Sequence, residues 1–145
     1  MTTTPRIARM VDQLGTAAPI RADDCPAVPK KPGLYMFTEA GRVMWVGTAK
    51  DLRQRIEHHT HYHHRGRHRT TSLLASTLAN NMAARATGRK MDAGDRLFRE
   101  AVLEAAARIR ERMEVRWLLV ADPVTRSVCE RAAIKRYQPE YNRQR

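Results

Sequence analysis

The sequence predicts one α+β domain, in which a sheet of at least three strands is flanked by helices. Three observations predict it: a strand-turn-strand pattern early in the chain, apolar residues at helical spacing in several segments, and a second strand-like stretch late in the chain. The length of 145 residues suffices for one domain with its own core. The cysteines, Cys25 and Cys129, form no CxxC pair, so we expect neither a zinc ribbon nor a disulfide framework.

Residues 1–31 are expected to form an N-terminal arm and a proline-rich connector. Apolar residues at helical spacing predict a short amphipathic helix over Pro5 to about Leu14, namely Ile7, Met10, Val11 and Leu14. Four prolines between Ala17 and Pro32 remove backbone donors and favour an extended chain there. We therefore expect the folded core to start near Pro26 and the main domain to span 32–145.

The first element of that domain is predicted to be a β-hairpin followed directly by a helix. Gly33 to Thr38 is typical of a strand, Glu39 to Arg42 of a tight turn, and Val43 to Gly47 of a returning strand. Asp51 is a suitable N-cap for the helix. That helix carries two pairs of residues four positions apart and so on one face each, Leu52 with Ile56 and Arg55 with His59.

A basic loop and a helical insertion are expected over about 60–112, between the second and third strands. Two helices are predicted there from apolar spacing, one by Leu73, Leu74, Leu78 and Met82, the other by Leu97, Ala101, Val102, Ala105 and Ile109. A buried strand follows at Val115, Trp117, Leu119 and Val120. The last helix is predicted to start at Pro123 and to run to about Tyr137, before Pro139 stops it.

The charge of the chain indicates a polyanionic partner. Lys and Arg number 27 against 15 Asp and Glu, a formal net charge of +12, and such an excess repels itself unless an anion is bound. The N-terminus has no unbroken apolar region, and no apolar run is long enough to cross a bilayer, so we expect a cytoplasmic protein without membrane contact. A basic scaffold protein with no nucleic-acid role remains an alternative.

A His/Arg-rich stretch begins in the helix after the hairpin. It holds all six histidines of the chain, His58, His59, His61, His63, His64 and His68. Arginines are interleaved with them, and we expect Arg65, Arg67 and Arg69 to contact nucleic-acid phosphates. Two other interpretations stay open: a solvated loop, and a transition-metal site, for which the spacing defines no closed zinc geometry.

Several short motifs follow one another along the chain, and their combination is far more specific than any one of them. A strand with Gly33-Leu34-Tyr35 is followed by one with Trp45-Val46-Gly47, then by Arg55 and His59 in the next helix, and much later by Glu130 and Asn142. This pattern resembles the GIY-YIG nuclease superfamily over roughly Pro32 to His59 and about Glu114 to Asn142. The resemblance implies a small three-stranded antiparallel sheet flanked by helices, carrying one metal-dependent active site.

The resemblance also implies a role for each motif residue. Glu130 matches the metal-binding glutamate, and its carboxylate suits one Mg²⁺ or Mn²⁺ ion. Arg55 would clamp the scissile phosphate, Tyr35 would act as a general base, and His59 would bind phosphate or relay a proton. The remaining matches, expected to support the site, are Gly33, Trp45, Gly47 and Asn142. Taken singly, residues of these types are ordinarily packed aromatics, solvated charges or surface ion-pair partners.

Two positions depart from the commonest superfamily pattern. Trp45 stands where a tyrosine is usual, and an indole N–H donates but does not accept a proton. Thr48 stands where a lysine or another polar group is usual, so Lys50 or Arg53 is expected to supply the charge toward phosphate. We therefore predict a DNA endonuclease acting in repair, recombination or mobile-element contexts, with branched or single-stranded regions among its possible substrates. The alternative is a nucleic-acid-binding module of the same fold that cleaves weakly or not at all because of Trp45.

Overall fold

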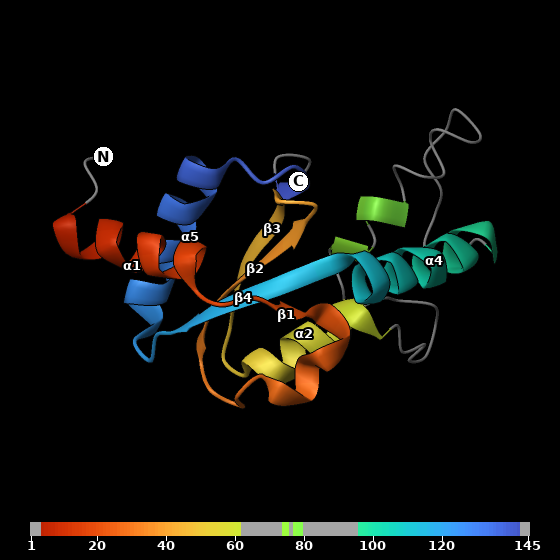
Figure 1. Cartoon of the computed structure of the whole chain (residues 1–145), viewed down its shortest axis with the longest axis horizontal. Coiled ribbons are helices and arrows are strands. Elements are labelled where there is room, and N and C mark those ends of the chain that lie inside the picture. Colours follow the sequence, from red (N-terminus) through yellow and green to blue (C-terminus); the bar gives the residue numbers. More distant parts are fainter. Residues whose placement is uncertain (1–3, 62–73, 76, 80–95, 143–145) are drawn as a thin grey trace.

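The computed structural model describes residues 4–61, 74–75, 77–79 and 96–142, with the backbone alone at 96–99. The predicted α+β class is confirmed: an antiparallel sheet is flanked by helices on both faces (Figure 1). The predicted Leu73 and Met82, and the arginines Arg65, Arg67 and Arg69, lie outside the described residues. Within the described part, no helix is long and apolar enough to span a membrane.

The sheet has four strands in the order β1-β4-β2-β3, one more than in the three-stranded sheet that the resemblance implies. β2 (Gly33–Glu39) pairs with β3 (Arg42–Ala49) as the predicted hairpin and with β4 (Met113–Leu119) on its other side. The extra strand, β1 (Ile20–Arg21), pairs with the outer edge of β4. A strand of two residues is too short to show an alternating pattern, which is why the sequence gives no sign of it.

The connector before the hairpin is folded back on the core, whereas an extended chain was expected. Ala22–Ala27 forms a 3-10 helix, η1, that contains Pro26. Cys25 and Val28 are buried in the same cluster as Tyr35 and Phe37 of β2. The prolines therefore shape a compact turn of chain in place of an extended connector.

The predicted helices next to the hairpin and at the two ends of the chain are confirmed. α1 (Pro5–Thr16) lies beside α5 (Pro123–Tyr137), whose ends agree with Pro123 and Pro139 as start and stop signals (Figure 1). α2 (Leu52–Thr60) starts at Asp51, whose carboxylate accepts a hydrogen bond from Gln54 N at 3.0 Å. This cap satisfies a backbone donor that the first turn of the helix leaves without a partner.

The expected insertion is partly described. Leu74 and Leu78 are helical and fully buried, and α4 (Arg96–Arg112) follows. Arg108 joins α4 to the end of β2 through a two-pronged ion pair with Glu39, with N to O distances of 2.7 and 2.9 Å. The hydrogen bonds from Arg108 hold the pKa of Glu39 below its ordinary value.

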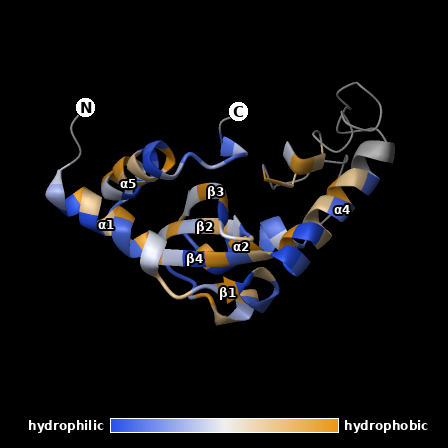
Figure 2. Ribbon diagram, turned by 45° about the horizontal axis from the view of Figure 1, so that its top comes forward, coloured by the Kyte–Doolittle hydropathy of each residue, from blue (hydrophilic) through white to orange (hydrophobic). Residues whose placement is uncertain are grey.

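The sheet separates two apolar clusters, because side chains of a strand alternate between its faces. Leu34, Met36 and Val46 face α1 and α5, whereas Tyr35 and Trp45 face α2 and α4. The helices show hydrophilic and hydrophobic residues in alternation along their length (Figure 2). One expectation fails in β4: Val115 is buried, but Leu119, the last residue of the strand, is 48% exposed, so the strand is buried along only part of its length.

Candidate active site

Both motif glycines lie where a side chain would collide with a neighbour. Gly47 of β3 pairs with Tyr35 of β2, and a Cβ at Gly47 would lie 2.4 Å from the phenol oxygen. A Cβ at Gly33 would lie 2.2 Å from the backbone oxygen of Leu118 on β4. Gly33 therefore allows the close approach of β4, and Gly47 leaves the space that the phenol of Tyr35 occupies.

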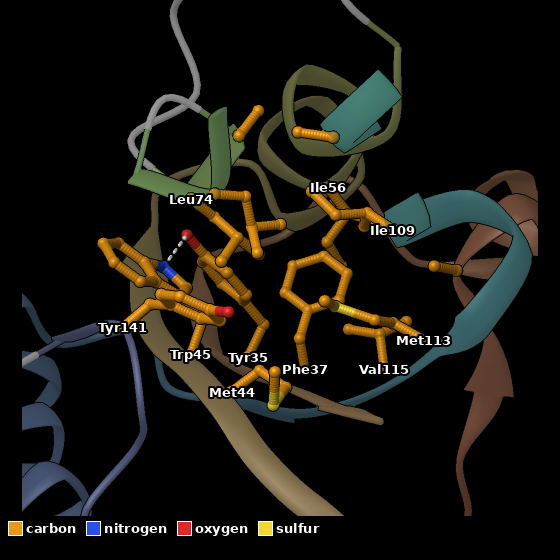
Figure 3. Packing of buried hydrophobic residues seen from close by; sticks show 14 of the residues in the cluster. Tyr35, Phe37, Met44, Trp45, Ile56, Leu74, Ile109, Met113, Val115 and Tyr141 are labelled. Carbon is orange, nitrogen blue, oxygen red and sulfur yellow. Dashed lines mark hydrogen bonds between the residues drawn. The ribbon is translucent and has the colours of Figure 1, made fainter. Parts of the chain in front are cut away.

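A hydrogen-bonded cluster surrounds the phenol of Tyr35. The indole Nε1 of Trp45 donates to the Tyr35 oxygen at 3.3 Å (Figure 3), and Nε2 of His59 lies 2.7 Å from the same oxygen. An indole N–H only donates, so the phenol accepts from Trp45, and we assign its own proton to the bond with His59. All three side chains are at most 3% exposed. Trp45 thus holds Tyr35 in place as a donor, without a hydroxyl of its own.

His59 is a neutral imidazole in this environment. Its pKa is lowered from 6.5 to about 3, mainly by burial and to a smaller extent by the positive charge of Arg55 and the neighbouring His58. A neutral ring can accept a proton at Nε2 from Tyr35, which a charged imidazolium cannot. The buried histidine is therefore poised as the acceptor in its bond with the phenol.

The motif residues from four elements line one cavity of about 140 Å³. β2 supplies Tyr35, β3 supplies Trp45, Gly47 and Thr48, α2 supplies Arg55 and His59, and α5 supplies Glu130. The first and last of these residues are 95 positions apart in the chain. The fold thus gathers Tyr35, Arg55, His59 and Glu130, the four predicted catalytic residues, around one space, which we call the first cavity.

Among the described residues, Glu130 is the only carboxylate that lines the first cavity. It is half-buried, and among the described residues its carboxylate has no hydrogen bond or ion pair. Nowhere in the described part of the chain do three His, Cys, Asp or Glu side chains gather as a metal cluster. A single free carboxylate beside a polar cavity suits Mg²⁺, which keeps several waters and takes substrate oxygens as further ligands.

Asn142 fixes the backbone of β3 next to the first cavity. Its side-chain oxygen accepts from Val46 N at 2.8 Å, and its amide nitrogen donates to Val46 O at 2.9 Å. Glu140 N and Tyr141 N donate to the backbone oxygens of Val43 and Met44 in the same way. The C-terminal segment therefore covers the open edge of β3 and holds Trp45 and Gly47 in register.

A larger cavity of about 490 Å³, which we call the second cavity, adjoins the first and shares Thr48 and Arg55 with it. Its charged residues are Lys50, Asp51, Arg55 and Arg126. Either Lys50 or Arg53 was expected to supply charge toward phosphate. Lys50 lines the second cavity, whereas Arg53 lines neither cavity, because its Nε donates to Val28 O at 2.7 Å. The sequence reasoning missed Arg126, although it lies four residues before Glu130 and so on the same face of α5.

Solved structures with a similar course of the chain are GIY-YIG N-terminal endonuclease domains of UvrC from Thermotoga maritima. A magnesium-bound form is 18% identical with a TM-score of 0.45, covering 97% of this chain and 99% of that one. A point mutant bound to its catalytic divalent cation is 19% identical with a TM-score of 0.44, covering 97% and 98%.

Sequence comparison relates the region of the hairpin and α2 to the same group. UvrABC system protein C of Thermus thermophilus is 38% identical over 59 residues, which make up 41% of this chain and 10% of that protein. Residues 31–93 match the family model described as the UvrC-like GIY-YIG domain. That segment contains both glycine motifs, Arg55 and His59. The match to the UvrC-like GIY-YIG domain therefore covers residues 31–93 of this chain.

Proposed function

We propose that the protein is an endonuclease that hydrolyses phosphodiester bonds in DNA and depends on a divalent metal ion. One observation carries the proposal: Tyr35, Arg55 and Glu130 come from three separate elements and line the same cavity. A base, a phosphate clamp and a metal ligand are what phosphodiester hydrolysis requires. The net charge of +12 supports a polyanionic substrate.

Arg55 and Glu130 would bind the two charged partners of the reaction. Arg55 is exposed on α2 and lines the cavity, where its planar donor fork would hold the scissile phosphate. Glu130 would hold Mg²⁺ or Mn²⁺ through its carboxylate. When bound there, the ion would supply positive charge to the phosphate and to the departing oxygen.

Tyr35 and His59 would move the proton of the attacking water. The phenol oxygen of Tyr35 would receive that proton while the phenol passes its own proton to Nε2 of His59, 2.7 Å away. Burial and the charge of Arg55 keep His59 neutral in the free protein. A phosphate anion bound by Arg55 offsets part of that charge, which raises the affinity of His59 for a proton during the reaction.

The biological setting belongs to the proposal as well. We propose DNA repair, recombination or a mobile element as the setting of the activity. Cys25 and Cys129 are free and buried, which suits a reducing cytoplasm. We assign the choice between branched, single-stranded and duplex DNA to the basic loop and insertion at about residues 60–112.

The test compares the native protein with Glu130→Gln on plasmid and branched DNA, with Mg²⁺, with Mn²⁺ and with a chelator. We expect nicking by the native protein in either metal, none with the chelator, and a loss of about 100-fold or more in the variant, while DNA binding is kept. Equal nicking by both proteins would refute the role of Glu130. If both proteins bind and neither cleaves, the binding-module alternative is correct.

A further inference from the structure

The second cavity contains a buried guanidinium whose donors are only partly used. Arg126 is 8% exposed, and its Nη1 donates to the backbone oxygens of Val120 at 3.1 Å and Ala121 at 2.8 Å. Among the described residues, its Nε and Nη2 have no hydrogen-bond partner, and no carboxylate forms an ion pair with it. Burying a cation without an anion is costly, so the site favours binding of an anion from solution.

Two acidic groups near Arg126 are engaged elsewhere, and Glu130, one helical turn away, lines the first cavity without forming an ion pair with Arg126. Asp51 lines the cavity, but its carboxylate caps α2 through Gln54 N. Asp122 caps α5 and accepts from both the backbone N and the hydroxyl of Thr125. Those bonds are the main reason for its lowered pKa, and the charge of Arg126 is a smaller one. Neither carboxylate neutralises the cavity.

Further cations face the same space from the other side. Lys50 is exposed at the end of β3, and Arg55 and His58 lie on one face of α2 with Asp51 and Gln54. Among the described residues, the cavity thus has three permanent cations, Lys50, Arg55 and Arg126, against one carboxylate. Its volume of about 490 Å³ is more than three times that of the first cavity, enough for a phosphate with part of its sugar.

The position of the second cavity relates it to the reaction proposed above. Arg126 and Glu130 are one helical turn apart on α5, a rise of about 6 Å, and each lines one of the two cavities. Arg55 and Thr48 line both. A nucleic-acid strand with one phosphate in the first cavity would therefore bring the next one to Arg126.

We propose that the second cavity binds the backbone phosphodiester next to the one that is cleaved, held by Arg126 and Lys50. The inference rests on the proposed function for the identity of the first phosphate, but the binding itself needs neither metal nor cleavage. Arg126 is a positioning residue in this account: it sets the register of the strand so that the scissile phosphate reaches Arg55 and Glu130.

The test measures binding of a fluorescein-labelled oligonucleotide, single-stranded and duplex, in a chelator and over a series of KCl concentrations. Lys50→Gln and Arg126→Gln are compared with Lys135→Gln, which removes an exposed lysine from the part of α5 that faces α1. We expect each of the first two to lower the slope of log K against log salt by about 0.7 to 0.9, the value for one lost phosphate contact. The control should keep the native slope.

Equal slopes in the native protein, Lys50→Gln and Arg126→Gln would overturn the inference even if the native protein cleaves DNA. Lowered slopes in a protein that never cleaves would leave a phosphate site at Arg126 and Lys50 standing and refute the endonuclease. If Arg126→Gln does not fold, as thermal unfolding would show, Lys50→Gln still decides, because no described residue bonds to its side chain.

A second measurement places the bound phosphate along the strand. A single uncharged methylphosphonate next to the cleaved bond should slow cleavage by the native protein about tenfold, as expected for one lost charged contact. It should slow Lys50→Gln much less, since that contact is already weakened. The same factor in both proteins would show that Lys50 does not hold the adjacent phosphate.

Discussion

The two faces of the central hairpin differ in chemistry although their residues alternate along the same strands. Leu34 and Met36 of β2 pack against α1 and α5 in a cluster of apolar side chains. Tyr35, between them, turns to the opposite face, where it meets Trp45 and His59. The first face serves only to hold the helices, whereas the second combines packing with polar groups that are fully enclosed.

This difference explains how the candidate site obtains reactive groups from common residues. A phenol and an imidazole in water would each be solvated and mobile. Behind β2 and β3 they are 3% and 2% exposed, and burial keeps the imidazole neutral. We therefore expect changes in the apolar cluster around Leu34 and Met36 to affect mainly stability, and changes around Tyr35 and His59 to affect mainly cleavage.

A large effect is expected from Gly47→Ala, which inserts a methyl group into the space of the Tyr35 phenol. A Cβ at 2.4 Å from the phenol oxygen must displace it, and a misplacement of about 1 Å costs roughly 100-fold in rate. Gly41→Ala is the matched control on the same hairpin, because nothing lies within 4 Å of its Cβ, although its φ of +80° also strains an alanine. A folded Gly47→Ala protein that cleaves at the native rate would contradict the proposed role of the Tyr35 face in cleavage.

On the opposite face, Met36→Ala should separate stability from activity. Met36 is 2% exposed, and truncating a buried methionine lowers the free energy of unfolding by about 2–5 kcal/mol. Urea denaturation measures this loss. Cleavage per folded molecule should stay within about twofold of native, and a large loss of cleavage in a fully folded sample would show that the two faces are not separate.

The buried His59 predicts a pH dependence of stability. Its pKa is about 3 in the folded protein and 6.5 when unfolded, so between these values only the unfolded chain binds the proton. Stability from this group is complete above pH 6.5 and is lost as the pH falls toward 3, with a slope of up to about 1.4 kcal/mol per pH unit. The slope should be smaller in His59→Gln, and identical slopes in the two proteins would contradict the neutral buried ring.

The smallest effect is expected from Trp45→Phe, which removes the 3.3 Å hydrogen bond to Tyr35 and keeps an aromatic ring. One neutral hydrogen bond contributes about 0.5–1.5 kcal/mol, so cleavage should fall about three- to tenfold. Trp45→Tyr, which offers the hydroxyl usual in the superfamily, is the companion variant and should lose less. An unchanged rate in Trp45→Phe would mean that the indole only fills space.

Much of this site could be predicted from sequence because its residues follow local patterns. Gly33, Tyr35 and Gly47 belong to a hairpin with strong strand signals, and Asp51 and Pro123 mark helix starts that the structure confirms. The relation of Glu130 to Tyr35 depends on the resemblance, because no local pattern joins residues 95 positions apart.

What could not be predicted depends on contacts between distant backbone atoms. β1 exists only because β4 offers an open edge. Arg53 turns away from the cavities because η1 folds back and brings Val28 O within reach. Arg126 is buried because the carbonyls of Val120 and Ala121 accept its guanidinium, and a helix pattern alone cannot distinguish it from an exposed arginine.

The central claim is that the phenol of Tyr35 takes part in cleavage of a phosphodiester held in the first cavity. Single-turnover cleavage by Tyr35→Phe, with saturating Mg²⁺ and with DNA binding measured separately, tests it most directly. Phenylalanine preserves the packing against Phe37 and removes only the hydroxyl. The account predicts native binding with cleavage slowed by about 10²- to 10⁴-fold. Cleavage by Tyr35→Phe at the native rate would contradict it.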